Sequence, residues 1–150
     1  MLYFEDITPG AKAAFGSYAV TREEVIDYAS KYDPQPFHLD DAAAAATYFG
    51  RLSASGWHTA AMVMRMLVDD MKGRSQAGLG SPGIDELRWI KPVYPGDTLR
   101  VETEVVDKRQ STSRPEMGSY RSLISTYNKH DELVMTLKSI GLIRVRGETD

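Results

Sequence analysis

The chain has 150 residues, of which 42% are hydrophobic and 26% charged, a composition that excludes a disordered chain and predicts one globular domain over residues 1–150. The formal net charge of −3 excludes the positive field that general nucleic-acid binding requires. The absence of cysteine excludes disulfides, thiolate catalysis and Cys-ligated zinc.

The first residues and the apolar segments predict neither export nor a membrane span. Residues 1–6 include early acidic side chains and no long apolar stretch, unlike a secretory signal. The longest helix-like apolar run, 60–64, stops at Arg65 and is far too short to cross a bilayer. We therefore expect a cytoplasmic protein without a membrane partner.

Two helices are predicted in the first third of the chain. Thr21 and Glu24 have the spacing of a capping box, and apolar residues recur after them at helical spacing, at Val25, Tyr28, Ala29 and Tyr32. The second helix is short and alanine-rich. It is expected to begin at Asp40 or Asp41 and to stop near Gly50.

A bent loop follows the first helix and carries two potential proton donors and acceptors. Asp33 and His38 are five residues apart, and Pro34 and Pro36 between them exclude a regular helix. If the loop bends enough for both side chains to reach one water, they supply a proton acceptor and a proton donor. The alternative is that they merely cap the loop.

A third helix is predicted to start after Ser55–Gly56 and to run from Trp57 to about Met71. Residues 57–68 are apolar almost all round, which indicates a helix that is buried on every side. We expect His58 to be a packed or hydrogen-bonded helix residue and His130, in a predicted turn, to be solvated.

The second half of the chain has the pattern of β-strands. Residues 84–91, 98–108, 118–128 and 132–146 are rich in β-branched and aromatic residues, and a further strand is expected at about 11–20. Hydrophobic and charged residues alternate along 99–105, which marks a half-buried strand. The predicted class is α+β, with an antiparallel sheet wrapped around one long helix.

Three segments together resemble the MaoC-like dehydratases, which include the R-specific enoyl-CoA hydratases of the hot-dog fold. Residues 32–40 resemble the Asp-x-Asn-Pro-x-His loop of that family, residues 54–59 stand where the family enters its central helix, and residues 91–99 resemble its strand-turn-strand signature. The resemblance covers nearly the whole chain. It implies a single hot-dog domain, and a homodimer or an assembly of dimers, with an acyl-CoA site near the dimer interface.

The resemblance also implies roles for individual residues. Asp33 and His38 match the catalytic pair, and Gly56 matches the glycine whose amide binds the thioester oxygen. Two positions depart from the family pattern: Gln35 replaces an asparagine, and Ala61 stands where some R-specific hydratases have a serine. The catalytic pair itself is intact.

The resulting functional prediction is a hydro-lyase that adds water to a 2-enoyl-CoA or dehydrates a 3-hydroxyacyl-CoA. Further substrate contacts are expected from Gln35, Ser55 and Trp57, and from Arg109 and Arg114, whose locally basic segment suits the phosphates of CoA. Three histidines without paired spacing predict no metal site. We expect no cofactor apart from the CoA of the substrate.

Two other functions fit the same residues less completely. A hot-dog acyl-CoA thioesterase shares the fold and the ligand but attacks the carbonyl carbon, and the pairing of Asp33 with His38 argues against it. A non-catalytic module that binds acyl thioesters is the second alternative. The departures at Gln35 and Ala61 keep this alternative open.

Overall fold

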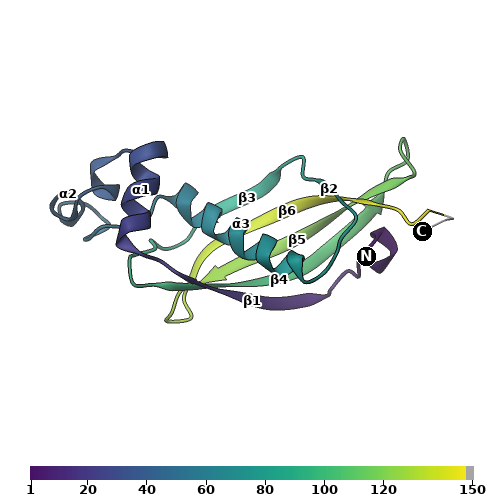
Figure 1. Cartoon of the computed structure of the whole chain (residues 1–150), viewed down its shortest axis with the longest axis horizontal. Coiled ribbons are helices and arrows are strands. Elements are labelled where there is room, and N and C mark those ends of the chain that lie inside the picture. Colours follow the sequence, from purple (N-terminus) through teal and green to yellow (C-terminus); the bar gives the residue numbers. More distant parts are fainter. Residues whose placement is uncertain (148–150) are drawn as a thin grey trace.

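The computed structural model describes residues 1–147, so the last three residues of the predicted domain lie outside it. Figure 1 labels its helices and strands and colours them along the sequence. They are the 3₁₀ turn η1 (Phe4–Asp6), β1 (Lys12–Ala19), α1 (Arg22–Tyr32), the 3₁₀ turn η2 (Pro36–His38), α2 (Asp41–Ala45), α3 (Gly56–Lys72), β2 (Gly78–Gly80), β3 (Ile84–Trp89), β4 (Thr98–Gln110), β5 (Met117–Tyr127) and β6 (Leu133–Arg144).

The described strands form one antiparallel sheet. Its order is β1-β4-β5-β6-β2, and β3 also pairs with β6, so that β1 lies at one edge and β2 and β3 lie at the other. The predicted α+β class and the five predicted strands are confirmed. Among the strands of the described residues, β2 alone was missed, because its three residues include two glycines and show no apolar alternation.

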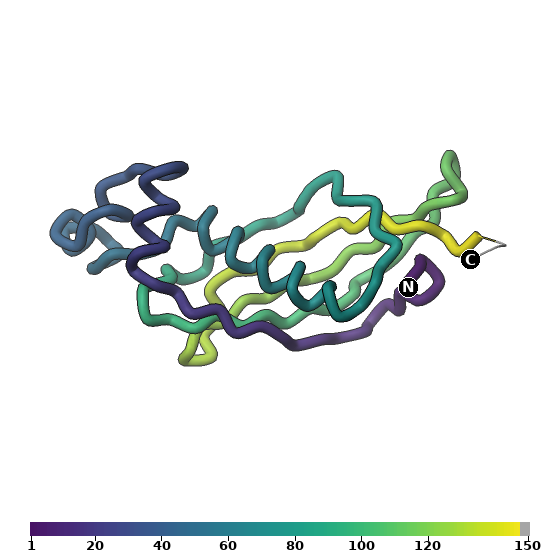
Figure 2. Tube along the Cα trace, viewed as in Figure 1, coloured from purple at the N-terminus to yellow at the C-terminus, as the bar shows by residue number. Residues whose placement is uncertain are grey.

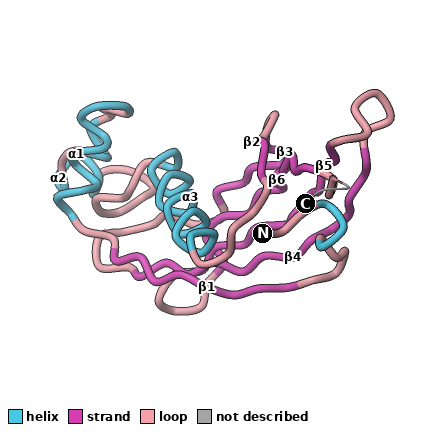
Figure 3. Tube along the Cα trace, turned by 45° about the vertical axis from the view of Figure 1, so that its right-hand side comes forward, coloured by secondary structure: helices cyan, strands magenta, loops and turns pink. Residues whose placement is uncertain are grey.

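Irregularities in strand pairing account for the curvature of the sheet. The register shifts between Phe15 and Tyr18 in β1, between residues 85 and 88 in β3, and between residues 105 and 107 in β4. Bulges of this kind bend a strand and increase its twist. Figure 3 shows the resulting sheet curling beneath α3.

The core lies between α3 and the concave face of the sheet. From α3 it receives Met62, Val63 and Met66, and from the sheet it receives Leu99, Val101, Ile124, Val134, Met135 and Leu137. Gly16 allows a close approach between β1 and α3, since a Cβ on it would lie 2.5 Å from the Met66 Sδ and its φ is +88°. The bulge in β1 and this glycine together bring α3 onto the strand.

The prediction that α3 is buried on every side is wrong for the single chain. One face of the helix is buried, but the opposite face carries an exposed stripe of residues at helical spacing: Trp57, Ala61, Met64, Val68 and Met71. The sheet curls around only one side of α3 (Figure 3), so nothing within residues 1–147 covers the stripe. An apolar face of this size indicates an interaction surface.

Helix α1 has the predicted position, whereas α2 is shorter than expected. Thr21 caps α1 by accepting a hydrogen bond from the Glu24 amide at 3.3 Å. Helix α2 ends at Ala45, five residues before Gly50, because the Thr47 hydroxyl bonds the Ala44 carbonyl at 2.7 Å and accepts from the Phe49 amide. Such side-chain bonds compete with the helix.

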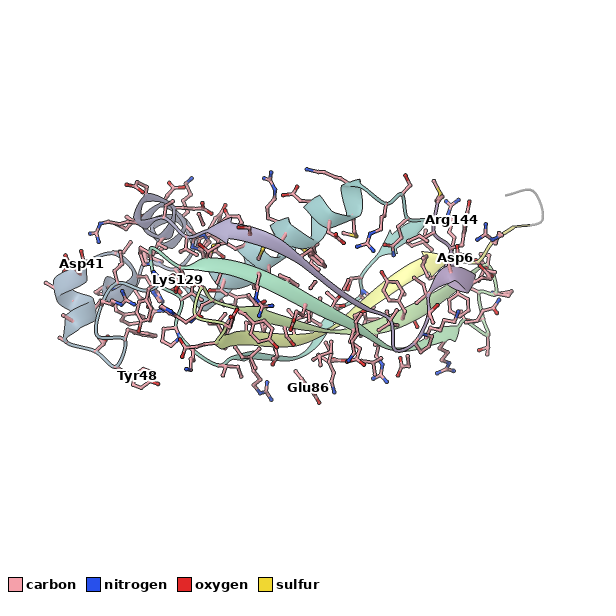
Figure 4. All side chains as sticks on the ribbon, turned by 90° about the horizontal axis from the view of Figure 1, so that it is seen from below. Asp6, Asp41, Tyr48, Glu86, Lys129 and Arg144 are labelled. Atoms are coloured by element: carbon pink, nitrogen blue, oxygen red, sulfur yellow. The ribbon has the colours of Figure 1, made fainter. Side chains whose placement is uncertain are left out.

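The molecule is elongated, and its two ends differ. Helices α1 and α2 and the segment that leads to α3 lie at one end, and the described chain termini lie at the other (Figure 2). Figure 4 shows the same separation, with Asp41 and Tyr48 far from Asp6 and Arg144. Within residues 1–147, no helix combines the length and the apolar character that a membrane span requires.

Candidate active site

The loop between α1 and α2 brings Asp33 and His38 together. Asp33 is the C-cap of α1, with its amide bonded to the Ala29 carbonyl at 2.9 Å, and His38 ends the 3₁₀ turn that begins at Pro36. The bend places the His38 Nε2 3.6 Å from the Asp33 Oδ2. The predicted convergence of the two side chains is therefore present in the geometry of the chain.

Two side chains hold the Asp33 carboxylate. The Ser55 hydroxyl donates to Oδ2 at 2.7 Å, and the Gln35 amide donates to Oδ1 at 2.6 Å. Burial raises the pKa of Asp33, but these two hydrogen bonds, together with His38, outweigh it and hold the pKa below its ordinary value. Asp33 is therefore an ionised proton acceptor at neutral pH.

The orientation and tautomer of His38 follow from its backbone partner. Its Nδ1 lies 2.7 Å from the Ser53 carbonyl oxygen, which can only accept, so Nδ1 carries the hydrogen. In the neutral ring this leaves Nε2 with its lone pair directed to the side of Asp33. Phe37 and Phe49 pack around the imidazole, with ring centroids 4.6 and 5.8 Å from it, and restrict its rotation.

The first turn of α3 offers free amides beside this pair. Ser55 occupies the N-cap position, but its side chain makes no capping bond because it donates to Asp33 instead. Within residues 1–147, no hydrogen bond from the Gly56 amide is found. This donor lies at the positive end of the helix dipole, where it favours a developing negative charge.

Gly56 is also required for packing. A Cβ at this position would lie 2.5 Å from Cε2 and 2.9 Å from Nε1 of the Trp89 indole, closer than real side chains approach. The edge of β3 therefore closes against the start of α3 only where the helix carries glycine. Trp89 contacts the site, although the sequence pattern identified it only as part of a strand.

Of the predicted substrate-binding residues, three lie at or next to the site and two arginines lie far from it. Gln35 and Ser55 both lie at the site, but in this chain each contacts the Asp33 carboxylate. Trp57 is 60% exposed, and its ring makes an edge contact with Trp89 at a centroid distance of 5.2 Å. Trp57 directly follows Gly56 in the chain and presents an exposed apolar ring at the start of α3.

Arg109 and Arg114 lie far from the site of their own chain. Arg109 is near the end of β4, and β4 starts beside α1 and runs for 13 residues, which is about 40 Å at the rise of a β-strand. The hairpin that carries Arg114 leads into Met117, which pairs with Arg144 at the opposite end of the molecule (Figure 4). One chain alone therefore does not bring these arginines to Asp33.

Two residues at the site, Ser53 and Trp89, were not predicted from the sequence, because no local sequence pattern marks the contacts that they make. Ser53 contributes its backbone carbonyl, so its side chain carries no signal. Trp89 reaches the site by tertiary packing. Within residues 1–147, no three His, Asp or Glu side chains gather in a group that could hold a metal ion.

Replacing Ser55 with Ala should raise the pKa of Asp33 and lower the free energy of unfolding at neutral pH by about 1.5–3 kcal/mol, the range for hydrogen bonds to charged groups. Asp33 has a depressed pKa in the folded state, so its stabilisation is present at neutral pH and is lost as the pH falls below about 4. Urea unfolding at pH 7 and pH 3 checks the prediction. The difference in unfolding free energy between wild type and Ser55→Ala should be smaller at pH 3 than at pH 7.

Ser53→Ala is the matched control for this substitution. The Ser53 hydroxyl is buried and has no hydrogen-bond partner among the described residues, so its removal should cost little at either pH. An equal loss of stability in both variants would contradict the role given to the Ser55 hydroxyl.

Known proteins are similar to this chain in both sequence and structure. The family model described as MaoC like domain matches residues 6–126. The crystal structure of the MaoC-like dehydratase from Rhodospirillum rubrum has a TM-score of 0.89 and 38% sequence identity, covering 98% of this chain and 99% of that chain. The 3-hydroxybutyryl-CoA dehydratase of Methylorubrum extorquens is 28% identical over 152 residues, 100% of this chain and 89% of that protein.

A third relative is the (R)-hydratase from A. caviae, involved in PHA biosynthesis, with a TM-score of 0.68 and 25% identity over 91% of this chain and 97% of that chain. The similarity in structure agrees with the sheet curled around α3. Since the family match spans most of the sequence, this chain belongs to the MaoC-like dehydratase family and has its hot-dog fold.

Proposed function

We propose that the protein adds water to a 2-enoyl-CoA, or removes it from a 3-hydroxyacyl-CoA, at the site formed by Asp33, His38 and Gly56. The single observation that carries this proposal is the meeting of three groups at the start of α3. An ionised carboxylate lies 3.6 Å from an oriented imidazole nitrogen, and a free helix amide lies next to the serine that holds the carboxylate.

The separation of Asp33 and His38 suits a bridging water. A distance of 3.6 Å is too long for a direct hydrogen bond, and one water can donate a hydrogen to the Asp33 Oδ2 and the other to the His38 Nε2. In this arrangement the water oxygen is free to attack, and both groups can accept its proton.

Hydration then divides into two bond-forming events. The water oxygen forms a bond to C3 of the enoyl group as the pair takes its proton, and the C2–C3 π electrons move onto the thioester to give an enolate. The same pair returns a proton to C2. The Gly56 amide stabilises the enolate oxygen in between, and a preorganised donor of this kind contributes roughly 3 kcal/mol in the transition state.

The reaction class needs no redox cofactor, because adding water leaves the overall oxidation state of the substrate unchanged. We therefore propose that CoA, as part of the substrate, is the only cofactor-like group involved. Arg109 and Arg114 lie far along the sheet from the Asp33 end of the chain, so they can bind its phosphates only if a second subunit brings them to the site.

A panel of 2-enoyl-CoAs of different chain lengths tests the proposed function. We expect loss of the conjugated-thioester absorbance with at least one member, and formation of the 3-hydroxyacyl-CoA by mass spectrometry. Release of free CoA from a saturated acyl-CoA would favour the thioesterase instead. Tight binding of enoyl-CoAs without turnover would favour the non-catalytic binding module.

We further propose that the protein is a homodimer. The exposed stripe on α3 continues through the contact of Trp57 with Trp89 onto the free edge of the sheet, where Ile84 is also exposed. An edge strand with unpaired backbone groups is seldom left uncovered in a soluble protein. A second copy can cover both the apolar stripe and the edge of β3.

Light scattering at micromolar concentration should give about twice the chain mass of 16.7 kDa. Ile84→Glu should shift the protein towards monomers, because it places a charge in the proposed interface. Val106→Glu is the matched control: Val106 is 46% exposed and Ile84 55%, but Val106 lies on β4, away from the α3 stripe. A monomeric wild-type protein that hydrates enoyl-CoA would rule out a site completed by a second copy.

A further inference from the structure

Three polar side chains from different elements meet on the side of α3 that faces α1 and β1. The Tyr18 hydroxyl of β1 donates to the Glu24 Oε1 at 2.5 Å, and the His58 Nε2 of α3 lies 3.1 Å from the same oxygen. His58 is only 2% exposed. None of the three touches the Asp33–His38 pair, and the mechanism above does not use them.

The protonation of this network follows from its contacts. Burial and the bond to Glu24 raise the pKa of Tyr18 to about 12, so the phenol remains a donor. Burial raises the pKa of Glu24, but the bonds from Tyr18 and His58 outweigh it and hold the pKa below its ordinary value. Glu24 is thus a carboxylate that accepts from both partners, and the His58 Nε2 carries the donated hydrogen.

The imidazole of His58 also packs against α1. It stacks on Tyr28 with a centroid distance of 4.6 Å and an interplanar angle of 7°, and Tyr28 contacts Tyr32 at 5.2 Å. Glu24, Tyr28 and Tyr32 are spaced four residues apart, so they lie along one face of α1. The next residue after Tyr32 is Asp33.

Besides its core packing, helix α1 is attached to the start of α3 by side-chain contacts at two points. One point is the bond from Ser55 to Asp33 at the end of α1, and the other is His58, which holds Glu24 and Tyr28 in its first turns. Ser55 and His58 stand on either side of Gly56. Buried Val25 and Ala29 hold the helix on the core, and the two side-chain attachments fix the direction of its C-terminal residue.

The geometry points to His58 as a positioning residue: bonded to Glu24, which also accepts from Tyr18, it orients α1 so that the Asp33 carboxylate faces the substrate bound at the Gly56 amide. This inference rests on the proposed hydration reaction. Its physical basis is that catalytic groups must be held within a fraction of an ångström, and a misplacement of about 1 Å can cost about 10²-fold in rate.

Two substitutions of His58 separate positioning from bulk packing. His58→Phe keeps an aromatic ring on Tyr28 but removes the donor to Glu24, whereas His58→Gln retains an N–H donor of similar reach. We expect His58→Phe to lower kcat by about 10- to 10²-fold with little change in KM, and His58→Gln to recover most of the loss. The proportion of folded protein is checked by circular dichroism.

Glu24→Leu provides a second route to the same test if His58→Phe folds poorly. It removes the acceptor at a partly exposed position and should reproduce the loss of kcat. Asp27→Asn is the matched control on the same helix, since Asp27 pairs with Lys31 on the exposed surface and should leave kcat unchanged.

An NMR titration of Asp33 gives a readout that does not depend on activity. In His58→Phe the loosened α1 should weaken the Ser55 bond, so the pKa of Asp33 should rise, whereas in His58→Gln it should stay at the wild-type value. An inactive wild-type protein would overturn the proposed function but leave this titration decisive. Wild-type kcat and wild-type Asp33 titration in folded His58→Phe, or equal losses in both His58 variants, would overturn the positioning role.

Discussion

Asp33→Asn should reduce the hydration of a 2-enoyl-CoA by about 10²–10⁴-fold, the usual contribution of a general acid or base. Asparagine keeps the size of the side chain and can still accept from Ser55, but it has no carboxylate to take a proton. His38→Ala should cause a loss of the same order. Steady-state kinetics at saturating substrate provide the measurement.

The double variant tests whether the two residues work as one unit. If Asp33 and His38 share one water, Asp33→Asn combined with His38→Ala should be little worse than the more damaged single variant. If the rate loss of the double variant equals the product of the two single losses, the two residues do not share one water. Thermal unfolding is the control, because His38 is buried and its removal can lower stability as well as activity.

Removing the amide hydrogen of Gly56 should lower turnover by about 10²–10³-fold, the usual effect of losing one oxyanion donor. Gly56→Val, the obvious variant, does not isolate this effect, because any Cβ meets the Trp89 indole at 2.5 Å. Gly56→Pro in a Trp89→Ala background avoids the clash. Proline suits the first helical position and lacks the N–H, and the ψ of 140° at Ser55 suits a following proline.

The matched control is Gly56→Ala in the same Trp89→Ala background. It adds a side chain at the same place but keeps the amide hydrogen, so the ratio of the two turnover numbers measures the donor alone. If the turnover numbers of the Gly56→Pro and Gly56→Ala variants differ by no more than a few-fold, the Gly56 amide is not the oxyanion donor. The thioester oxygen would then bind elsewhere.

The features that could be predicted from the sequence are those set by local physics. Helical spacing predicted α1 and α3, and alternation with turn residues predicted five strands to within a few residues. The pairing of Asp33 with His38 was predictable because two prolines confine a very short loop. The convergence of the two proposed proton-transfer residues therefore follows from the local sequence.

The features that could not be predicted depend on contacts between distant segments. Glu24 has the spacing of a capping box, yet its carboxylate bonds Tyr18 and His58 instead of the backbone of Thr21. The Thr21 side chain still makes its own capping bond, to the Glu24 amide. Ser55 looks like a plain N-cap, but its hydroxyl holds Asp33. In both cases the side chain bonds a residue that is distant in sequence instead of the nearby backbone. The spacing of residues in the sequence does not reveal this partner.

The exposure of α3 has a similar origin. Hydrophobic side chains all round a helix predict burial, but they do not say whether the same chain or a second copy provides the cover. The curled sheet covers the face with Met62 and Met66, and the face with Trp57 and Met64 remains exposed in the single chain.

The most direct test of the central claim is the reaction of purified protein with the panel of 2-enoyl-CoAs in D₂O, followed by mass spectrometry. We predict that the wild-type protein converts at least one member to the 3-hydroxyacyl-CoA with deuterium at C2, because the proton returned to C2 originates from solvent, and that Asp33→Asn forms almost none. A panel that stays unchanged in the presence of folded wild-type protein, or an Asp33→Asn variant as active as the wild type, would contradict the proposed hydration.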